Sequence, residues 1–348
     1  MLKADGRFLS ILALVMAVVA FMVIGLGAYT RLTDAGLGCP DWPGCYGQIA
    51  VPDSGQAIDQ AQQLYPGKPV IAKKAWAEMV HRYFAGALAT GIFLVAITCV
   101  FYAAKRGFRY LILAMALFLL IIYQALLGMW TVTLQLLPIV VTQHLLGGMI
   151  ILSLLWLTYL MAKPNFPSNK YTGLSTKWRP WVLLGLALVF CQILLGAWTS
   201  TNYAAISCPD FPYCQGGWHQ AFDFKHAFTP LTALGVNYDG GVLSVIARQT
   251  IQMTHRMGAL IVSLYIIGLV IAFLIALPKY HIIRKLLCVV VIVLVLQVSL
   301  GILNVLLQLP LLTAVAHNLV AASLLVILVT LSYITFSCSR QKESERIK

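Results

Sequence analysis

Glu78-Met79-Val80-His81-Arg82 lies where a long polar stretch gives way to an apolar run of about membrane-spanning length. The pattern recurs 174 residues later as Gln252-Met253-Thr254-His255-Arg256, again at the start of an apolar run. Glutamine stands in the second copy where the first copy has glutamate. Because a motif repeated with its surroundings is typical of an internal duplication, we expect two similar halves.

Other segments repeat in the same order along the chain. Two of them recur at an offset of 169 residues and two at an offset of 173. The matched segments are 27–30 with 196–199, 39–45 with 208–214, 124–128 with 297–301, and 143–145 with 316–318. The duplication therefore covers most of the chain.

The composition predicts an all-α polytopic membrane protein. Of 348 residues 60% are hydrophobic and only 10% are charged. Apolar runs of about 20 residues suit membrane-spanning helices, because a helix satisfies its own backbone hydrogen bonds in lipid. A soluble protein is excluded. Eight transmembrane helices are expected near 8–29, 79–104, 109–132, 139–162, 181–200, 254–277, 285–308 and 312–337.

The distribution of basic residues predicts the orientation. The formal charge of +13 is concentrated around 3–7, 105–109, 163–179, 279–285 and the C-terminal tail, which all fall on one side of the membrane. By the positive-inside rule that side is cytoplasmic, so both termini are inside and the loops 30–78 and 201–253 are periplasmic. The charge thus indicates orientation in a bacterial inner membrane, with no nucleic acid as a partner. The first apolar run is interpreted as a helix and not as a cleaved signal, because it resembles an internal segment.

Four helices per half give the domain organisation. An even number of crossings returns the chain to its starting side, so the two four-helix bundles should share one orientation and be related by a pseudo-twofold along the membrane normal. The N-terminal half is expected over 1–165, a cytoplasmic linker over 166–180, and the C-terminal half over 181–348.

Four histidines are the main candidates for chemistry. His81, His144, His255 and His317 each lie a few residues inside a predicted helix that runs from outside to inside. A histidine within a membrane is a functional hypothesis by default. Two at similar depth in one bundle can approach a flat ligand from opposite sides, as six-coordinate haem iron requires. We therefore expect two histidine pairs that act as axial ligands of haem iron.

Other interpretations of these histidines stay open. A single membrane histidine often serves as a hydrogen-bonding group between helices, although two equivalent pairs favour ligation. Zinc or copper without a porphyrin would usually need three or four side-chain donors together. The other three histidines, His219, His226 and His281, lie in predicted loops and are expected to be solvated.

Two cysteine pairs lie in the outer loops. Cys39 and Cys45, and likewise Cys208 and Cys214, bracket short proline-containing turns. An outward location in a bacterial envelope is oxidising, so we expect a disulfide in each pair. The spacing is not that of covalent c-type haem attachment. It leaves open whether the disulfides only staple the loops or take part in redox chemistry.

These features together resemble a known family. Arg31-Leu32-Thr33 before the first cysteine pair, the Glu-x-x-His-Arg pattern at 78–82 and the later histidines are similar to haem A synthase over nearly the whole chain. The resemblance implies an oxidoreductase that converts the C8 methyl of haem O to the formyl group of haem A, for haem-copper terminal oxidases. It implies haem O synthase, which is a farnesyltransferase, and cytochrome oxidase assembly factors as partners.

The resemblance also implies different roles for the halves. His81 and His144 would flank the substrate haem, and His255 and His317 a resident haem B. The Glu78 to Gln252 difference agrees with this division, since glutamine cannot carry charge. Glu78 is the candidate catalytic residue: it could stabilise a cation or act as a base, and partial burial could raise its pKa. A helix N-terminal glutamate favoured by the macrodipole is the alternative.

Two arginines and two other functions complete the expectations. Arg82 and Arg256 could pair with haem propionates, or extend to the membrane interface. A dihaem b-type cytochrome that exchanges electrons with quinone would explain the four histidines, but not the glutamate–glutamine difference. A transporter with repeated halves would place its site near the midplane, whereas these histidines lie toward one face.

Overall fold

The computed structural model describes residues 6–164, 166, 176–214, 222–230, 233–278 and 282–346. Within these ranges the chain forms α-helices joined by loops and one short 3-10 turn, with no β-strand, so the all-α expectation is confirmed. Much of the predicted linker 166–180 lies outside the described residues, as do His219 and His281.

Eight helices are long and apolar enough to cross a membrane, as expected. They are α1 (Arg7–Leu32), α3 (Ala72–Arg106), α4 (Arg109–Thr133), α5 (Pro138–Ala162), α6 (Arg179–Thr201), α8 (Val245–Ala276), α9 (Ile283–Leu306) and α10 (Leu311–Arg346). The short helices α2 (Gly55–Leu64) and α7 (Phe224–Ala227) lie in the two long loops, and the 3-10 turn η2 (Thr176–Trp178) precedes α6.

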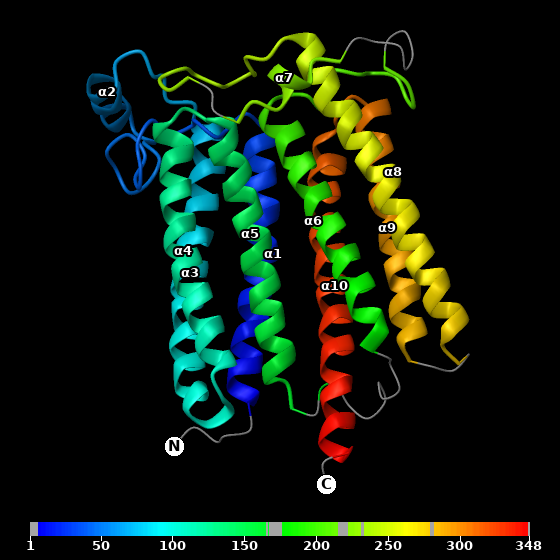
Figure 1. Cartoon of the computed structure of the whole chain (residues 1–348). Helices are drawn as coiled ribbons and strands as arrows, with labels where there is room; N and C mark the ends of the chain where they lie inside the picture. The colour runs from blue at the N-terminus through cyan, green and yellow to red at the C-terminus, as the bar shows by residue number, and fades with distance from the viewer. Residues whose placement is uncertain are drawn as a thin grey trace.

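The helices form two bundles that stand side by side (Figure 1). In one, α1, α3, α4 and α5 contact one another in a closed ring, and in the other α6, α8, α9 and α10 do the same. The helices α2 and α7 lie at one end of the bundles, and α1 begins and α10 ends at the opposite end (Figure 1). The bundles meet through α1 with α10, α5 with α6, and α5 with α10. The halves thus contact through equivalent helices, while the pseudo-twofold itself stays a prediction.

The duplication extends to the backbone of the turns. Gln135 and Leu136 in the first half, and Gln308 and Leu309 in the second, all have positive φ, between 51° and 63°. Both glutamines donate their side-chain amide to the carbonyl three residues earlier, at 3.1 and 3.2 Å. Since positive φ is uncommon outside glycine, the match shows that each half makes the same turn between its third and fourth spanning helices.

Three helix ends differ from the predicted ones. Helix α3 begins at Ala72 and not near 79, α8 begins at Val245 and not near 254, and α10 continues to Arg346. Hydropathy detects only apolar turns, whereas the added turns contain alanine, lysine, glutamine and glutamate, which favour helices in water as well. With 35 residues α3 is about 50 Å long, more than the apolar thickness of a bilayer. The added turns of α3 and α8 therefore extend into the loop layer.

One continuous apolar core joins the halves. Buried residues of α5 and α10, such as Leu155 and Leu328, belong to a single cluster with residues of the other spanning helices. Trp156 of α5 donates its indole N–H to the hydroxyl of Thr330 on α10, at 2.8 Å. At the loop end Arg31 of α1 donates to the carbonyl of Ser200 on α6, at 2.5 Å, and lies over the ring of Tyr203. The two bundles are thus joined to each other both within the apolar core and at the loop end.

Candidate functional site: two histidine pairs

The structure brings His81 and His144 together inside the first bundle. His81 is on α3 and His144 on α5, which lie across the ring from each other because each contacts α1 and α4. The ring centres of the two imidazoles are 6.5 Å apart, with planes at 87°. His81 is the tenth residue of α3, deeper along its helix than predicted because α3 starts early.

The second bundle repeats this arrangement. His255 is the eleventh residue of α8 and His317 the seventh of α10, again on helices that face each other across a ring. The two rings lie within range of electrostatic interaction. As whole residues all four histidines are of intermediate exposure, while Nδ1 of His81 and Nδ1 of His144 are shielded from solvent.

Each histidine packs against a glycine of a neighbouring helix. A Cβ on Gly27 of α1 would lie 3.0 Å from Cε1 of His81, and one on Gly128 of α4 would lie 3.5 Å from that of His144. In the second half the corresponding glycines are Gly196 and Gly301, at 3.1 and 3.0 Å from the rings of His255 and His317. A Cβ at Gly27, Gly196 or Gly301 would require the facing ring to shift by a few tenths of an ångström, whereas one at Gly128 would make an ordinary contact. In the sequence these glycines could have been recognised because they recur at equivalent positions of the two halves.

The spacing of the first pair fits a metal held between two imidazoles. Two imidazoles that bind one metal from opposite sides, through nitrogens about 2 Å from it, have ring centres about 6 to 7 Å apart. The 6.5 Å between His81 and His144 falls in this range. Nδ1 of each has no hydrogen-bond partner among the described residues. The histidine pair of the first bundle thus fits a haem with two axial histidines.

The imidazoles of the second half are held by glutamines. The side-chain amide of Gln192 lies 3.0 Å from Nδ1 of His255 and donates to its carbonyl oxygen at 2.9 Å. Nδ1 of His317 lies 3.1 Å from the carbonyl of Gln297, whose amide is 3.2 Å from Nε2 of the same ring. Partners of this kind orient an imidazole. Iron binding at Nε2 of His317 would require the Gln297 amide to move away from that nitrogen.

Gln192 has no counterpart in the first half. The equivalent position, 169 residues earlier, is Val23. Room for Gln192 is made by Gly258, whose added Cβ would lie 2.3 Å from the amide oxygen, and the residue equivalent to Gly258 is the bulky Phe84. Sequence reasoning missed Gln192, although a glutamine within an apolar helix, opposite a valine in the repeat, could have drawn attention to it.

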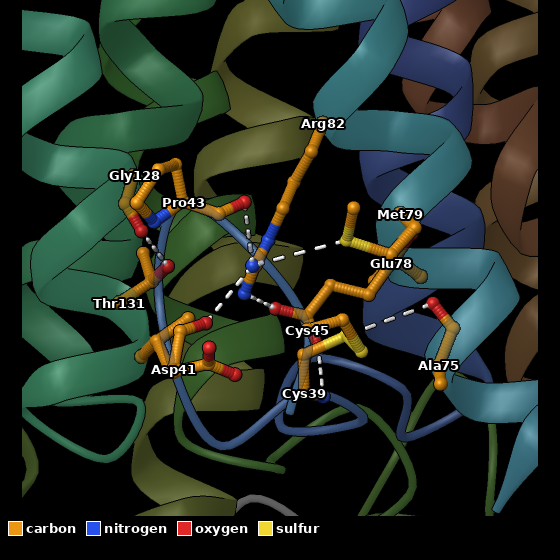
Figure 2. Close-up of polar contacts among 12 residues, drawn as sticks. Cys39, Asp41, Pro43, Cys45, Ala75, Glu78, Met79, Arg82, Gly128 and Thr131 are labelled. Carbon is orange, nitrogen blue, oxygen red and sulfur yellow. Dashed lines mark hydrogen bonds and ion pairs between the residues drawn. A yellow bond between two sulfur atoms is a disulfide. The ribbon is translucent and has the colours of Figure 1, made fainter. Parts of the chain in front are cut away.

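Glu78 and Gln252 occupy equivalent buried positions against the cysteine loops. The backbone N–H of Cys39 donates to Oε2 of Glu78 at 2.9 Å (Figure 2), and that of Cys208 donates to Oε1 of Gln252 at 2.6 Å. Glu78 is 4% exposed and Gln252 is 3% exposed. Gln252 also donates to the carbonyl of Ala205 at 2.6 Å, which a carboxylate could not do. Each side chain ties its helix to the first cysteine of its loop.

The two predicted disulfides are both present. Cys39 is bonded to Cys45 and Cys208 to Cys214, and all four residues are buried. Tyr46, next to the first disulfide, donates its hydroxyl to the carbonyl of Pro69 at 2.9 Å. Burial, and to a smaller extent the charge of Asp41, raises the pKa of Tyr46, which keeps this hydroxyl a donor. The first disulfide thus belongs to a compact loop packed on α3.

Arg82 and Arg256 point into these loops. Arg82 forms an ion pair with Glu78 and donates to the carbonyls of Asp41 and Gly44 (Figure 2). Arg256 donates to the carbonyls at Cys208, Asp210 and Tyr213, at 2.7 to 2.8 Å. The propionate contacts expected for both arginines stay a prediction, since their terminal nitrogens here bind loop carbonyls.

Fold and site together define a class: a duplicated helical-bundle membrane protein with one facing histidine pair in each bundle. The sequence pattern of the COX15-CtaA family, described as cytochrome oxidase assembly protein, matches residues 10–329. The chain belongs to this family.

Several curated proteins are similar to it over almost their whole length. A "Heme A synthase" of Shewanella oneidensis is 43% identical over 91% of this chain and 93% of its own. Proteins of the same name from Caulobacter sp. (strain K31) and Halalkalibacterium halodurans are 30% and 25% identical, over 95% and 97% of this chain and 97% and 99% of their own. The similarity thus includes both halves.

Proposed function

We propose that this protein is a haem A synthase, a membrane enzyme that oxidises the C8 methyl of haem O to the formyl group of haem A. The observation that carries the proposal is a duplicated pair of facing histidines whose surroundings differ between the halves. Membership of the cytochrome oxidase assembly family and the name of the similar curated proteins support it. A dihaem electron carrier would not need to belong to this family, and its two halves would not need to differ.

The resident cofactor is assigned to the second half. His255 and His317 would hold haem B, because Gln192, which the first half lacks, keeps the imidazole of His255 oriented. A bound haem would supply iron for electron transfer there. His81 and His144 would flank the substrate haem O and the product haem A. Their Nδ1 atoms have no side-chain partner among the described residues, as suits a ligand that must enter and leave.

Glu78 is proposed to assist the oxidation of the substrate methyl. It would stabilise positive charge or accept a proton there, and Gln252 could do neither at ordinary pH. Its hydrogen bond from Cys39 and its ion pair with Arg82 give it a structural role at the same time. Arg82 and the first disulfide would then hold the carboxylate in place beside α3, the helix that carries His81.

The location follows from the eight apolar helices and the basic segments. We place the protein in the bacterial inner membrane with both termini cytoplasmic and the cysteine loops periplasmic. The substrate would come from haem O synthase, and cytochrome oxidase assembly factors would receive the product. The orientation is tested with a single cysteine introduced at Gly107, between α3 and α4. An impermeant thiol reagent added to intact cells should not label this cysteine if the turn is cytoplasmic.

Formation of haem A in cells tests the activity. The chain is expressed in a host that makes haem O but lacks its own haem A synthase, and the extracted haems are identified by chromatography and mass. Haem A should appear with this chain and be absent with an empty vector. A purified protein that carries haem B at both sites, with no haem A in the cells, would favour the dihaem electron carrier instead.

A further inference from the structure

Arg248 lies on the same face of α8 as His255. The two residues are seven positions apart, which is two helical turns and about 10 Å along the axis, so their side chains leave the helix in nearly the same direction. Arg248 is in the first turn of α8, on the side of His255 that faces the loops. It is therefore placed above the second histidine pair, at the loop end of the bundle.

No described residue pairs with the Arg248 side chain. Its Nε is shielded from solvent and has no hydrogen-bond partner among the residues that the structure describes. A shielded arginine nitrogen without a partner is costly, and arginine forks suit carboxylates through two parallel hydrogen bonds. Nε of Arg256 is likewise without a partner among the described residues, but the terminal nitrogens of Arg256 already donate to loop carbonyls. Of these two arginines, Arg248 is the one whose position calls for an anion.

The charge at the start of α8 also favours a bound anion. The positive end of a helix dipole favours acidic side chains in the first turn, and neither α3 nor α8 has one there. Instead the first turn of α8 has Arg248, and the position 174 residues earlier in α3 is Lys74. Lys74 precedes His81 by the same seven residues. Helices α3 and α8 thus each begin with a basic residue beside the positive end of the helix dipole, one above each histidine pair.

We propose that Arg248 binds the carboxylate side chains of the haem in the second half. This inference rests on the proposed function. A guanidinium can bind a carboxylate through two hydrogen bonds, whereas an ammonium is a compact point charge with no fixed fork.

Haem with and without free carboxylates tests the assignment. The full-length chain is purified from haem-deficient cells as wild type, R248Q, R248K and K74Q, and titrated with haem B and with haem B dimethyl ester, followed by the Soret absorption. The wild type should bind the free acid about 10- to 100-fold more tightly than the ester. R248Q should lose this preference at the tighter site, R248K should keep part of it, and K74Q should leave that site unchanged. Circular dichroism establishes that the variants are folded.

The outcomes separate this inference from the proposed function. A folded R248Q that prefers the free acid as strongly as the wild type, and releases haem B to apomyoglobin at the same rate, would overturn the assignment of Arg248 alone. A wild type that binds haem but does not discriminate against the ester would do the same. A wild type that binds no haem at all would overturn the proposed function, and this inference with it.

Discussion

The two halves share a fold and a histidine pair but differ in what surrounds the pair. In the second half Gln192 contacts the imidazole of His255, and Gln252 ties the helix to its loop by a neutral amide. Gln297 contacts His317, but its equivalent Gln124 is present in the first half as well. In the first half Val23 replaces Gln192, and Glu78 brings a carboxylate paired with Arg82. The duplication thus places a histidine pair in each half, and a few substitutions near the pairs are what the proposed division into a retaining and a reacting site rests on.

Removal of a ligand should have the largest effect. H255A should lose the resident haem, because a site with one axial ligand gone loses a metal bond that no neighbour replaces. H81A should lose haem from the first half only, since the ligands of the other pair are untouched. Haem iron per chain, measured on purified protein, should fall by about half in each. Unchanged iron in both variants would mean that these histidines are not ligands.

Exchange of the acid and the amide should have the next largest effect. E78Q should retain haem and stop formation of the formyl group, because glutamine can neither carry charge nor accept a proton. The measurement is the haem A yield in cells, with bound haem as the control. Q252E should leave haem A formation in place and cost about 1 kcal/mol of stability through the lost hydrogen bond to Ala205. A normal haem A yield from E78Q would reject the catalytic role of Glu78.

Loss of Gln192, which contacts His255, should weaken the retention of haem B. In Q192V the second half acquires the valine of the first, and the imidazole loses its orienting partner. Haem B should then be released about 10- to 100-fold faster, in line with the usual effect of such partners on metal binding. Transfer to apomyoglobin measures the rate. The folded H81A protein serves as the comparison, because its second half is intact; release from Q192V at the same rate as from H81A would contradict the role of Gln192.

A methyl group beside the ring should have the smallest effect. G27A places a Cβ about 3.0 Å from Cε1 of His81, so the ring must shift by a few tenths of an ångström. We expect about 1 to 2 kcal/mol weaker binding of haem in the first half. The matched control is G86A on α3, where an added Cβ meets nothing within 4 Å. Equal haem affinity in G27A and G86A would show that the glycine is not needed for the position of the ring.

Much of the fold was readable from the sequence, because hydropathy and repeats report it directly. The eight spans, the two halves and the four histidines followed from patterns at fixed spacing. The starts of α3 and α8 did not, since their first turns are helical but polar. Nor did the contacts of Arg82 and Arg256 with loop carbonyls, because backbone acceptors brought near by folding leave no signature in the sequence.

The two histidine pairs should hold two different haems, and the haem that remains when one pair is removed tests this most directly. The double variants H81A/H144A and H255A/H317A are purified from cells that make haem O, and the bound haem is extracted and identified by chromatography and mass. Loss of the first pair should leave only haem B, and loss of the second should leave haem O or haem A without haem B. The same haem in both preparations, or haem B retained without His255 and His317, would contradict the account.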